Sequence, residues 1–364
     1  MSTTTIQSRR DLFEHLEYTI EGTYDELVED QELQPGQTML KTFLIESNVT
    51  PEQLRERIDI AKARQVDFDL YELVIRRNGT KHTFFLDSSE SRFWTLYTLE
   101  ESDDAKAVVK DMVNGVRNGL DYTWMPVEQQ RDVMDMGEFR DVGVSYEADE
   151  VFSSDYIDDR LDFGDLSVQS SGRGTSTLFD ILDSQEELSS FLSLSAVGIK
   201  REIGGSFVLE RVTHNGRFTT SGGDSIQLHI DTVDEIKNRY AGLLQRIEEH
   251  HRISYESKEH GTGIDGTPLV IEFDNKIDDV REFIENIITA KNPLRLWGAK
   301  TKLDEQYWKV KGIDLHNNDK YTMEICPEWI RLYLDEEACG NTALRIYSNL
   351  QRHYDSNAVM EVLE

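Results

Sequence analysis

A lysine-rich stretch with two tryptophans holds the side chains of this sequence best suited to bind a charged ligand. Residues 291–314, KNPLRLWGAKTKLDEQYWKVKGID, contain five of the fifteen lysines of a chain whose formal net charge is −31. Between Lys291 and Lys311 the local charge is +4, from six cationic and two acidic side chains. Because ammonium groups contact phosphates and aromatic rings stack on bases, a surface that binds nucleic acid is one of the functions consistent with this pattern.

The segment LRLWGAKTKLDEQYWKVKGI reads as a hairpin, in which alternate residues of each strand lie on one face. Lys300 and Lys302 then share one face of the first strand, and Lys309 and Lys311 share one face of the second. Four ammonium groups cannot form a core. We expect them to line the side of the sheet that helices leave uncovered, with Trp308 as an aromatic contact.

A second predicted hairpin, VGIKREIGGSFVLERVTHNGRF, is also basic. Its candidate contacts are Lys200, Arg201, Arg211 and Arg217. Three interpretations of the two hairpins remain open. The lysines could lie over nearby aromatic rings and neutralise the protein's own acidic surface, they could dock an acidic protein partner or a second copy of the chain, or they could contact nucleic acid.

Two glycine-rich motifs have simpler structural explanations. GTGIDG, residues 261–266, matches G-x-G-x-x-G, but a dinucleotide site needs a strand before the motif and a helix after it, and here a helix precedes and a strand follows. SSGRGTST, residues 170–177, lacks the G-K-[ST] ending of a P-loop. We therefore expect turns or linkers at both places and no bound cofactor.

The histidines do not form a recognisable metal-binding pattern. His250 and His251 follow two glutamates at the end of a predicted helix. Adjacent helical residues point about 100° apart, so the two imidazoles cannot bind one ion. His316, His353 and Asp355 would meet only if a predicted hairpin turn contacted the last helix. The sequence therefore predicts no metal site.

Only two cysteines are present, Cys326 and Cys339. They are too few for a disulfide scaffold or a four-thiolate metal site. Cys339 precedes a predicted helix, where thiols are more reactive, but a small packed thiol at a turn is the commoner meaning. We expect no catalytic residues, although an enzyme with a site between units stays open as an alternative.

The acidic composition indicates the environment of the protein. Seventy acidic residues stand against 39 basic ones along the whole chain, and arginines outnumber lysines by 24 to 15. At molar salt the Debye length falls to ~3 Å, so repulsion within such a surface is screened. We expect the cytoplasm of a salt-in halophile, where global acidity does not exclude nucleic acid as a partner. No segment has the apolar length of a membrane span, so no membrane partner is expected.

A repeated order of elements must position the basic hairpins. Hairpin turns are predicted at Asn78-Gly79, at Asn215-Gly216 and around Asn317 and Asn318. A helix is predicted before each hairpin, within residues 48–65, 184–193 and 278–290, and the first two have N-terminal capping signals at Thr50 and at Ser184 with Glu187. An apolar strand precedes each helix, at 39–45, 178–182 and 268–273, and another strand and helix follow each hairpin.

The sequence thus predicts an α+β fold of two or three tandem units, each with the order strand, helix, three or four antiparallel strands, helix. Both helices of a unit should cover one face of its sheet. This order resembles the TATA-box-binding-protein-like fold and, more loosely, the units of DNA sliding clamps. The resemblance is one of topology and rests on no sequence motif.

The expected boundaries follow from these patterns and from an Asp-, Ser- and Gly-rich segment between the first two units. They are an N-terminal helical segment (1–38), a first unit (39–147), an acidic linker or long loop (148–177), a second unit (178–256), a short linker (257–268) and a third unit (269–364). We expect a binding protein for nucleic acid or another macromolecule. The alternative is a structural or assembly protein, in which the same faces form a homo-oligomer.

Overall fold

The computed structural model describes residues 6–21, 37–258 and 261–363. The chain divides into two compact units. Unit 1 comprises the chain to residue 123 with 133–139 and 197–238, and unit 2 comprises 124–132, 140–196 and the chain from residue 239. The segment 178–256, expected as a single unit, therefore contributes to both.

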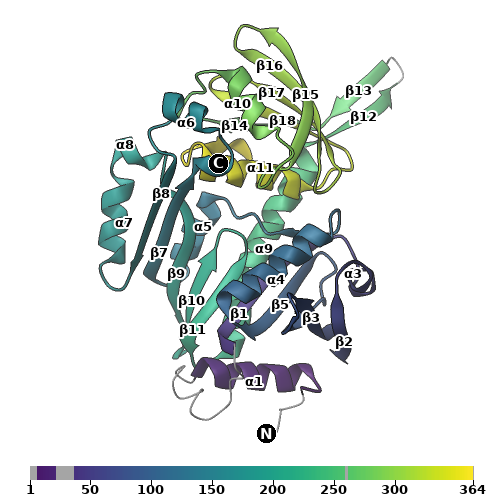
Figure 1. Cartoon of the computed structure of the whole chain (residues 1–364), viewed down its shortest axis with the longest axis vertical. Coiled ribbons are helices and arrows are strands. Elements are labelled where there is room, and N and C mark those ends of the chain that lie inside the picture. The colour runs from purple at the N-terminus through teal and green to yellow at the C-terminus, as the bar shows by residue number, and fades with distance from the viewer. Residues whose placement is uncertain (1–5, 22–36, 259–260, 364) are drawn as a thin grey trace. The chain divides into compact units, whose positions relative to one another are not determined.

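Unit 1 contains the strand, helix, four strands, helix order that the sequence predicts. Its elements are β1 (Gln37–Ser47), α3 (Pro51–Arg57), β2 (Ile60–Asp67), β3 (Leu70–Arg77), β4 (Thr80–Asp87), β5 (Phe93–Glu100) and α4 (Ser102–Gly115). The strand order is β2-β3-β4-β5-β1, with antiparallel ladders, and the short β6 (Leu120–Tyr122) also pairs with β1. Figure 1 shows α4 packed against this sheet.

Local sequence signals explain how this order begins. The Thr50 side chain caps α3 and forms a capping box with Gln53, and Pro51 is the first helical residue, as predicted. Asn78 and Gly79 have φ angles of 49° and 84°, the pair of positive values that a type I′ hairpin turn requires. These features were predictable because each depends on residues close together in the sequence.

Helices cover both faces of the unit 1 sheet, whereas the sequence predicted that one face would stay open. On one face, strand residues pack against α4, and the main contributors are Phe43, Ile45, Leu73, Phe84, Trp94, Leu96, Val108, Val109 and Met112. On the other face, α1 (Arg9–Glu21) inserts Leu12, Leu16 and Ile20 against β1, β5 and the start of α9 (Ile226–His250). Each such side chain contributes roughly 1.5–3 kcal/mol by burial.

Three further strands continue the unit 1 sheet beyond β1. These are β9 (Ser193–Ile203), β10 (Ser206–Thr213) and β11 (Arg217–Gly223). β11 pairs with β1, with Lys41 opposite Thr219, and β10 pairs with β11. The turn at Asn215-Gly216 has a positive φ only at Gly216, 74°, so it is not the type I′ turn expected there.

The middle of the chain departs from the predicted repeat. The expected leading strand at 178–182 lies inside a helix, α7 (Thr175–Asp183), because its apolar residues also fit helical spacing. The expected capping box at Ser184 does not form. α8 (Glu186–Ser189) has Gln185 as its N-cap, with no side-chain cap hydrogen bond. This part of the chain therefore adds strands to the sheet without repeating the first unit's order.

The segment 148–177, expected as a linker or long loop, contains regular structure. It holds η1 (Ala148–Glu150), α6 (Ser154–Arg160), β8 (Asp165–Ser171) and the start of α7, and β8 pairs with β7 (Glu138–Glu147). Phe152 and Tyr156 are buried, and their rings stack 4.8 Å apart. These few aromatic residues anchor a segment whose acidic and serine-rich composition predicted a loop.

Unit 2 repeats the predicted order. Its elements are β14 (Leu269–Glu272), α10 (Val280–Ile287), β15 (Leu296–Asp304), β16 (Tyr307–Asp314), β17 (Lys320–Ile325), β18 (Trp329–Asp335) and α11 (Gly340–His353). The strand order β15-β16-β17-β18-β14 matches that of β2-β3-β4-β5-β1 in unit 1. The predicted α+β fold is therefore correct, and two of the three predicted repeats share one topology.

Short elements complete unit 2. They are α5 (Val127–Met134), β12 (Arg252–Lys258), β13 (Gly261–Asp265), β19 (Val359–Met360) and η2 (Glu361–Leu363). The GTGIDG motif, expected as an interdomain turn, is mostly strand β13, which pairs with β12. Asn318, in the turn between β16 and β17, has a φ of 63°, as a turn at this point requires. No helix within the described ranges is long and apolar enough to cross a bilayer.

Candidate nucleic-acid interface

The ladder between β15 and β16 decides where the lysine-rich segment places its side chains. Lys302 pairs with Trp308 and Lys300 with Val310, whereas Lys309 and Lys311 pair with threonine and alanine of β15. Directly paired residues of an antiparallel ladder point to the same side. The four lysines therefore do not share one face, which corrects the expectation from the sequence.

A bulge causes this division. At the turn, Asp304 pairs with Tyr307, and a regular ladder continued from that pair would place Lys302 opposite Lys309. The register shifts between Lys302 and Asp304, so Lys302 instead meets Trp308. A shift of one residue moves side chains to the opposite face.

One side of the sheet carries Lys300, Lys302 and Trp308 and is covered by helices nearby. Val310, which points to this side, is fully buried, and α10 contacts β16. Lys300 forms an ion pair with Glu285 of α10. Hydrogen bonds from Lys300 and Arg281 lower the pKa of Glu285. Lys300 is thus engaged within the protein, while Lys302 is exposed at the end of the strand.

The opposite side of the sheet presents aromatic and cationic side chains together. We call this surface the aromatic face, and its members are Trp297, Tyr307, Lys309, Lys311, Lys320, Glu324, Trp329, Arg331 and Tyr333. Trp297 is 55% exposed, and Lys311, Lys320 and Arg331 are also exposed. Trp297 is therefore among the most exposed large apolar side chains of the described residues.

Neighbouring strands place the cations close to Trp297. Trp297 lies opposite Ile313, which in turn lies opposite Lys320. Lys311 pairs with Ala299, two residues further along β15, so it is a diagonal neighbour of Trp297. Strands lie about 4.8 Å apart, so Lys311 on the adjacent strand and Lys320 one strand further place two ammonium groups on the β16 side of Trp297.

Glu324 organises the centre of the aromatic face. Its carboxylate accepts hydrogen bonds from the hydroxyls of Tyr307 at 2.9 Å and Tyr333 at 3.0 Å, and Lys309 approaches it at 3.4 Å. Burial opposes ionisation of Glu324, but these three donors outweigh it and lower its pKa. The Tyr307 ring also meets that of Trp329 edge to face at 5.9 Å. These contacts fix the orientation of the aromatic side chains on this face.

Comparison with known proteins assigns the chain to a family. The model of the MJECL33-like protein family matches residues 1–364. The chain belongs to this family. The uncharacterized protein MJECL33 of Methanocaldococcus jannaschii is 30% identical over 394 residues, which cover 98% of this chain and 94% of the relative. The similarity therefore spans both units.

The second basic hairpin of this MJECL33-like chain is less available for a ligand. Lys200 forms an ion pair with Glu202 at 2.8 Å, and Arg201 forms one with Glu235 at 2.6 Å. The Lys200 ammonium also lies 5.1 Å from the Phe207 ring centroid. These two residues neutralise the protein's own carboxylates, which was one of the three interpretations left open by the sequence.

Arg211 and Arg217 lie on the side of the unit 1 sheet that α4 covers, since Arg217 pairs with Phe43 of that core. Burial lowers the pKa of both guanidinium groups, and Asp103 offsets part of the effect at Arg217. The two arginines were expected on an open hairpin face. They are instead half-buried, because helices cover both faces of this sheet.

Lys41 of β1 lies on the same side of the sheet as Arg211 and Arg217, and the sequence did not predict this buried cation. It points to the same side as Arg217 and is 1% exposed. Its ammonium donates to the Glu100 carbonyl oxygen at 2.7 Å and to the Thr38 hydroxyl. Burial lowers the pKa of Lys41 to about 8, although the acidic Glu100 and Glu101 offset part of this effect. No sequence signal separates this buried lysine from a surface one.

A buried polar network on the other face of unit 1 was also missed. His229 of α9 places Nδ1 2.7 Å from Glu210 Oε1 and Nε2 2.8 Å from the Thr42 hydroxyl. The side chains of His229 and Glu210 are both fully buried. Thr220 donates to the same carboxylate at 3.2 Å. Every named group has a partner, so the network specifies the packing of α9 on the sheet.

His251 and Cys326 of this family member have local partners. His251 Nδ1 lies 3.2 Å from the Thr267 hydroxyl, and Glu248 accepts a hydrogen bond from the Gly340 N–H at the start of α11. Burial raises the pKa of Cys326, whose thiol contacts Glu328. These contacts indicate structural roles for the motifs weighed in the sequence.

Proposed function

We propose that this protein binds single-stranded nucleic acid on the aromatic face of unit 2 and acts without catalysis. The observation that carries the proposal is the exposed indole of Trp297 beside Lys311 and Lys320 on one side of a sheet. Bases stack on aromatic rings, and ammonium groups follow the phosphates of the same strand. A sheet surface with both features suits unpaired bases better than a duplex groove.

The acidic composition of the chain strengthens the role of stacking in this proposal. A net charge of −31 repels a polyanion in dilute salt, whereas molar salt screens that repulsion. The same salt weakens contacts between lysines and phosphates, because counterion release then contributes less. In a salt-rich cytoplasm the affinity therefore depends mainly on Trp297 and its aromatic neighbours.

Fluorescence anisotropy of a labelled single strand of about 16 nucleotides, titrated at several KCl concentrations, tests the proposal. Trp297→Ala should weaken binding by about 1–3 kcal/mol, or roughly 5- to 150-fold. Lys311→Glu and Lys320→Glu should each weaken binding and flatten its salt dependence. Equal binding by all three variants and the unchanged protein would reject the aromatic face.

Lys302→Glu is the matched control for the lysine variants. It makes the same change of charge in the same sheet, but Lys302 points to the opposite side. The affinity of Lys302→Glu for the single strand should stay within a factor of about two of that of the unchanged protein, apart from the general effect of net charge. A loss as large as that of Lys311→Glu would indicate a nonspecific charge effect.

Assembly of several copies is the second candidate function for this face. Trp297 and Leu303 are both exposed on β15, and exposed apolar side chains of this size are typical of subunit contacts. Light scattering after size exclusion in about 2 M KCl distinguishes the two functions, since that salt screens the acidic surface. A monomer that co-elutes with a single strand favours nucleic-acid binding. A defined oligomer that Trp297→Ala dissociates favours assembly.

A further inference from the structure

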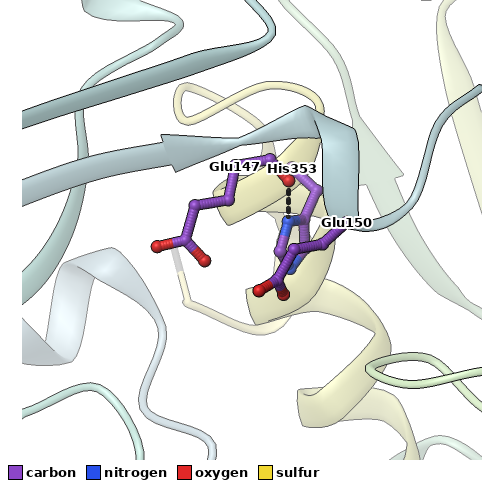
Figure 2. A group of neighbouring side chains, drawn as sticks. All are labelled: Glu147, Glu150 and His353. Carbon is purple, nitrogen blue, oxygen red and sulfur yellow. Dashed lines mark hydrogen bonds between the residues drawn. The ribbon is translucent and has the colours of Figure 1, made fainter. Parts of the chain in front are cut away.

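Three side chains of unit 2 converge at the junction of β7 and α11, away from the aromatic face. Glu147 ends β7, Glu150 belongs to the η1 turn that follows it, and His353 is the last residue of α11. Each offers one nitrogen or oxygen atom, and these three atoms lie within 4.8 Å of one another (Figure 2). They combine one imidazole with two carboxylates, a set that binds divalent transition metals.

The hydrogen bonding of His353 prepares one ring nitrogen for a ligand. The ring is buried, with 2% exposure, and its Nδ1 lies 2.6 Å from the Glu147 carbonyl oxygen. A carbonyl oxygen only accepts, so Nδ1 carries the proton and Nε2 keeps its lone pair in the uncharged ring. Within the described part of the chain, no group hydrogen-bonds to Nε2, and Figure 2 shows that nitrogen directed toward the Glu150 carboxylate.

This arrangement matches the outer shell of metal-binding histidines. A histidine ligand commonly donates its other ring N–H to a backbone carbonyl, which fixes the ring's orientation and tautomer. The Nδ1–H bond to the Glu147 carbonyl oxygen therefore leaves the Nε2 lone pair available to a cation that the two carboxylates also contact.

Arg352 positions one of the carboxylates. Its guanidinium donates from Nε to Glu147 Oε2 at 3.2 Å and pairs with the other carboxylate oxygen. Carboxylate oxygens accept more than one partner, so this pairing leaves lone pairs for an ion. With Arg352 the group carries a charge of −1, from two carboxylates and one guanidinium, and a divalent cation reverses that sign.

We propose that His353, Glu147 and Glu150 bind one divalent first-row transition ion, such as Zn²⁺, that fastens the C-terminal end of α11 to the end of β7. Ligand bonds of about 2.0–2.2 Å place neighbouring ligand atoms roughly 3.4 Å apart in a tetrahedral site. The present separations of up to 4.8 Å therefore need only small side-chain rotations to reach this geometry. Water completes the coordination on the exposed side.

The test uses the full-length protein, stripped of metal by a chelator and titrated with Zn²⁺ in competition with a chromogenic chelator. The KCl is kept near 1 M, to screen weak binding to the acidic surface. One ion per chain should bind, and Glu150→Gln should weaken binding at least tenfold. This variant keeps the shape of an exposed side chain, so it should still fold. Zn²⁺ should raise the melting temperature of the unchanged protein more than that of Glu150→Gln.

Asp149→Asn is the matched control, because it removes one exposed carboxylate next to the proposed ligands. Its zinc affinity and its zinc-dependent gain in melting temperature should equal those of the unchanged protein. Equal loss in Asp149→Asn and Glu150→Gln would overturn the site in favour of diffuse acidic binding. The site would also be overturned if Glu150→Gln bound zinc as tightly as the unchanged protein, or if the unchanged protein bound no stoichiometric zinc.

Discussion

Arg331 lies over the ring of Trp329, with its guanidinium carbon 4.3 Å from the ring centroid. This contact holds a cation and an aromatic side chain in one place on the aromatic face. It also keeps the indole partly covered, so the ring is less available than that of Trp297. The two tryptophans of this face therefore differ in their surroundings, since Trp329 is held by Arg331 and Trp297 is 55% exposed.

Replacing Arg331 should change stability by a small and defined amount. Arg331→Ala should lower the free energy of unfolding by ~0.5–1 kcal/mol, the usual value of an exposed cation–π contact. Arg331→Lys should lose less, because an ammonium group still lies over the ring although it cannot stack as a plane. Urea unfolding followed by tryptophan fluorescence at constant KCl measures both. An alanine variant as stable as the unchanged protein would show that the contact contributes nothing.

Two turn glycines of unit 1 form a matched pair for measuring steric cost. Both have positive φ angles, but a Cβ at Gly79 meets nothing within 4 Å, whereas one at Gly216 would lie 1.9 Å from the Thr123 hydroxyl oxygen. Gly79→Ala should cost about 1 kcal/mol of unfolding free energy. Gly216→Ala should cost about 2–4 kcal/mol, since the turn must also move. Equal losses in a urea titration would mean that the turn at Gly216 adjusts freely.

The buried amine of Lys41 should give stability a dependence on pH. Its pKa is about 8 in the folded protein, below the ordinary value of 10.5. Between these two values the unfolded chain binds more protons, so the free energy of unfolding rises with pH through this window. Lys41→Met lacks that rise. The difference in unfolding free energy between the two proteins should change steadily from pH 8 to 10.5, and a constant difference would contradict the shift.

The pair formed by His229 and Glu210 should be strongly coupled. His229→Leu or Glu210→Leu alone leaves a buried polar partner without its hydrogen bond and should cost about 3 kcal/mol or more. The double variant should cost at least 1 kcal/mol less than the sum, because neither polar group remains. A double-mutant cycle from urea unfolding gives the coupling energy directly. Additive losses would mean that each residue acts through other neighbours.

The topology was predictable where short sequence signals determine it. The capping residues around Thr50, the Asn78-Gly79 turn and the helix predicted within residues 278–290, now α10, each depend on neighbours in sequence, and all three are confirmed. The strand predicted at 178–182 was wrong, because the pattern of apolar residues in this short segment fits a strand and a helix equally well. The packing of helices on both faces of the unit 1 sheet was not predicted, since nothing in the sequence of α1 identifies the strands that it contacts.

The site was harder to predict, because registers and long-range contacts decide it. Whether Lys302 and Lys309 share a face depends on a β-bulge of one residue between Lys302 and Asp304. No local sequence pattern predicts this bulge. The proposed metal ligands are more distant still. Glu147 and Glu150 are three residues apart, but His353 lies some two hundred residues further along the chain, and only the folded unit brings them together.

The position of β15 gives the lysine-rich segment a further meaning. β15 ends the strand order of its sheet, so in the described structure it has a partner strand on one side only. An unpaired strand edge attracts other chains and leads to aggregation. Lys302 places an exposed positive charge on this edge, whereas the charge of Lys300 is paired with Glu285. Charged side chains, lysine above all, disfavour the pairing of exposed strand edges between copies, so the lysine at this edge also acts against self-association.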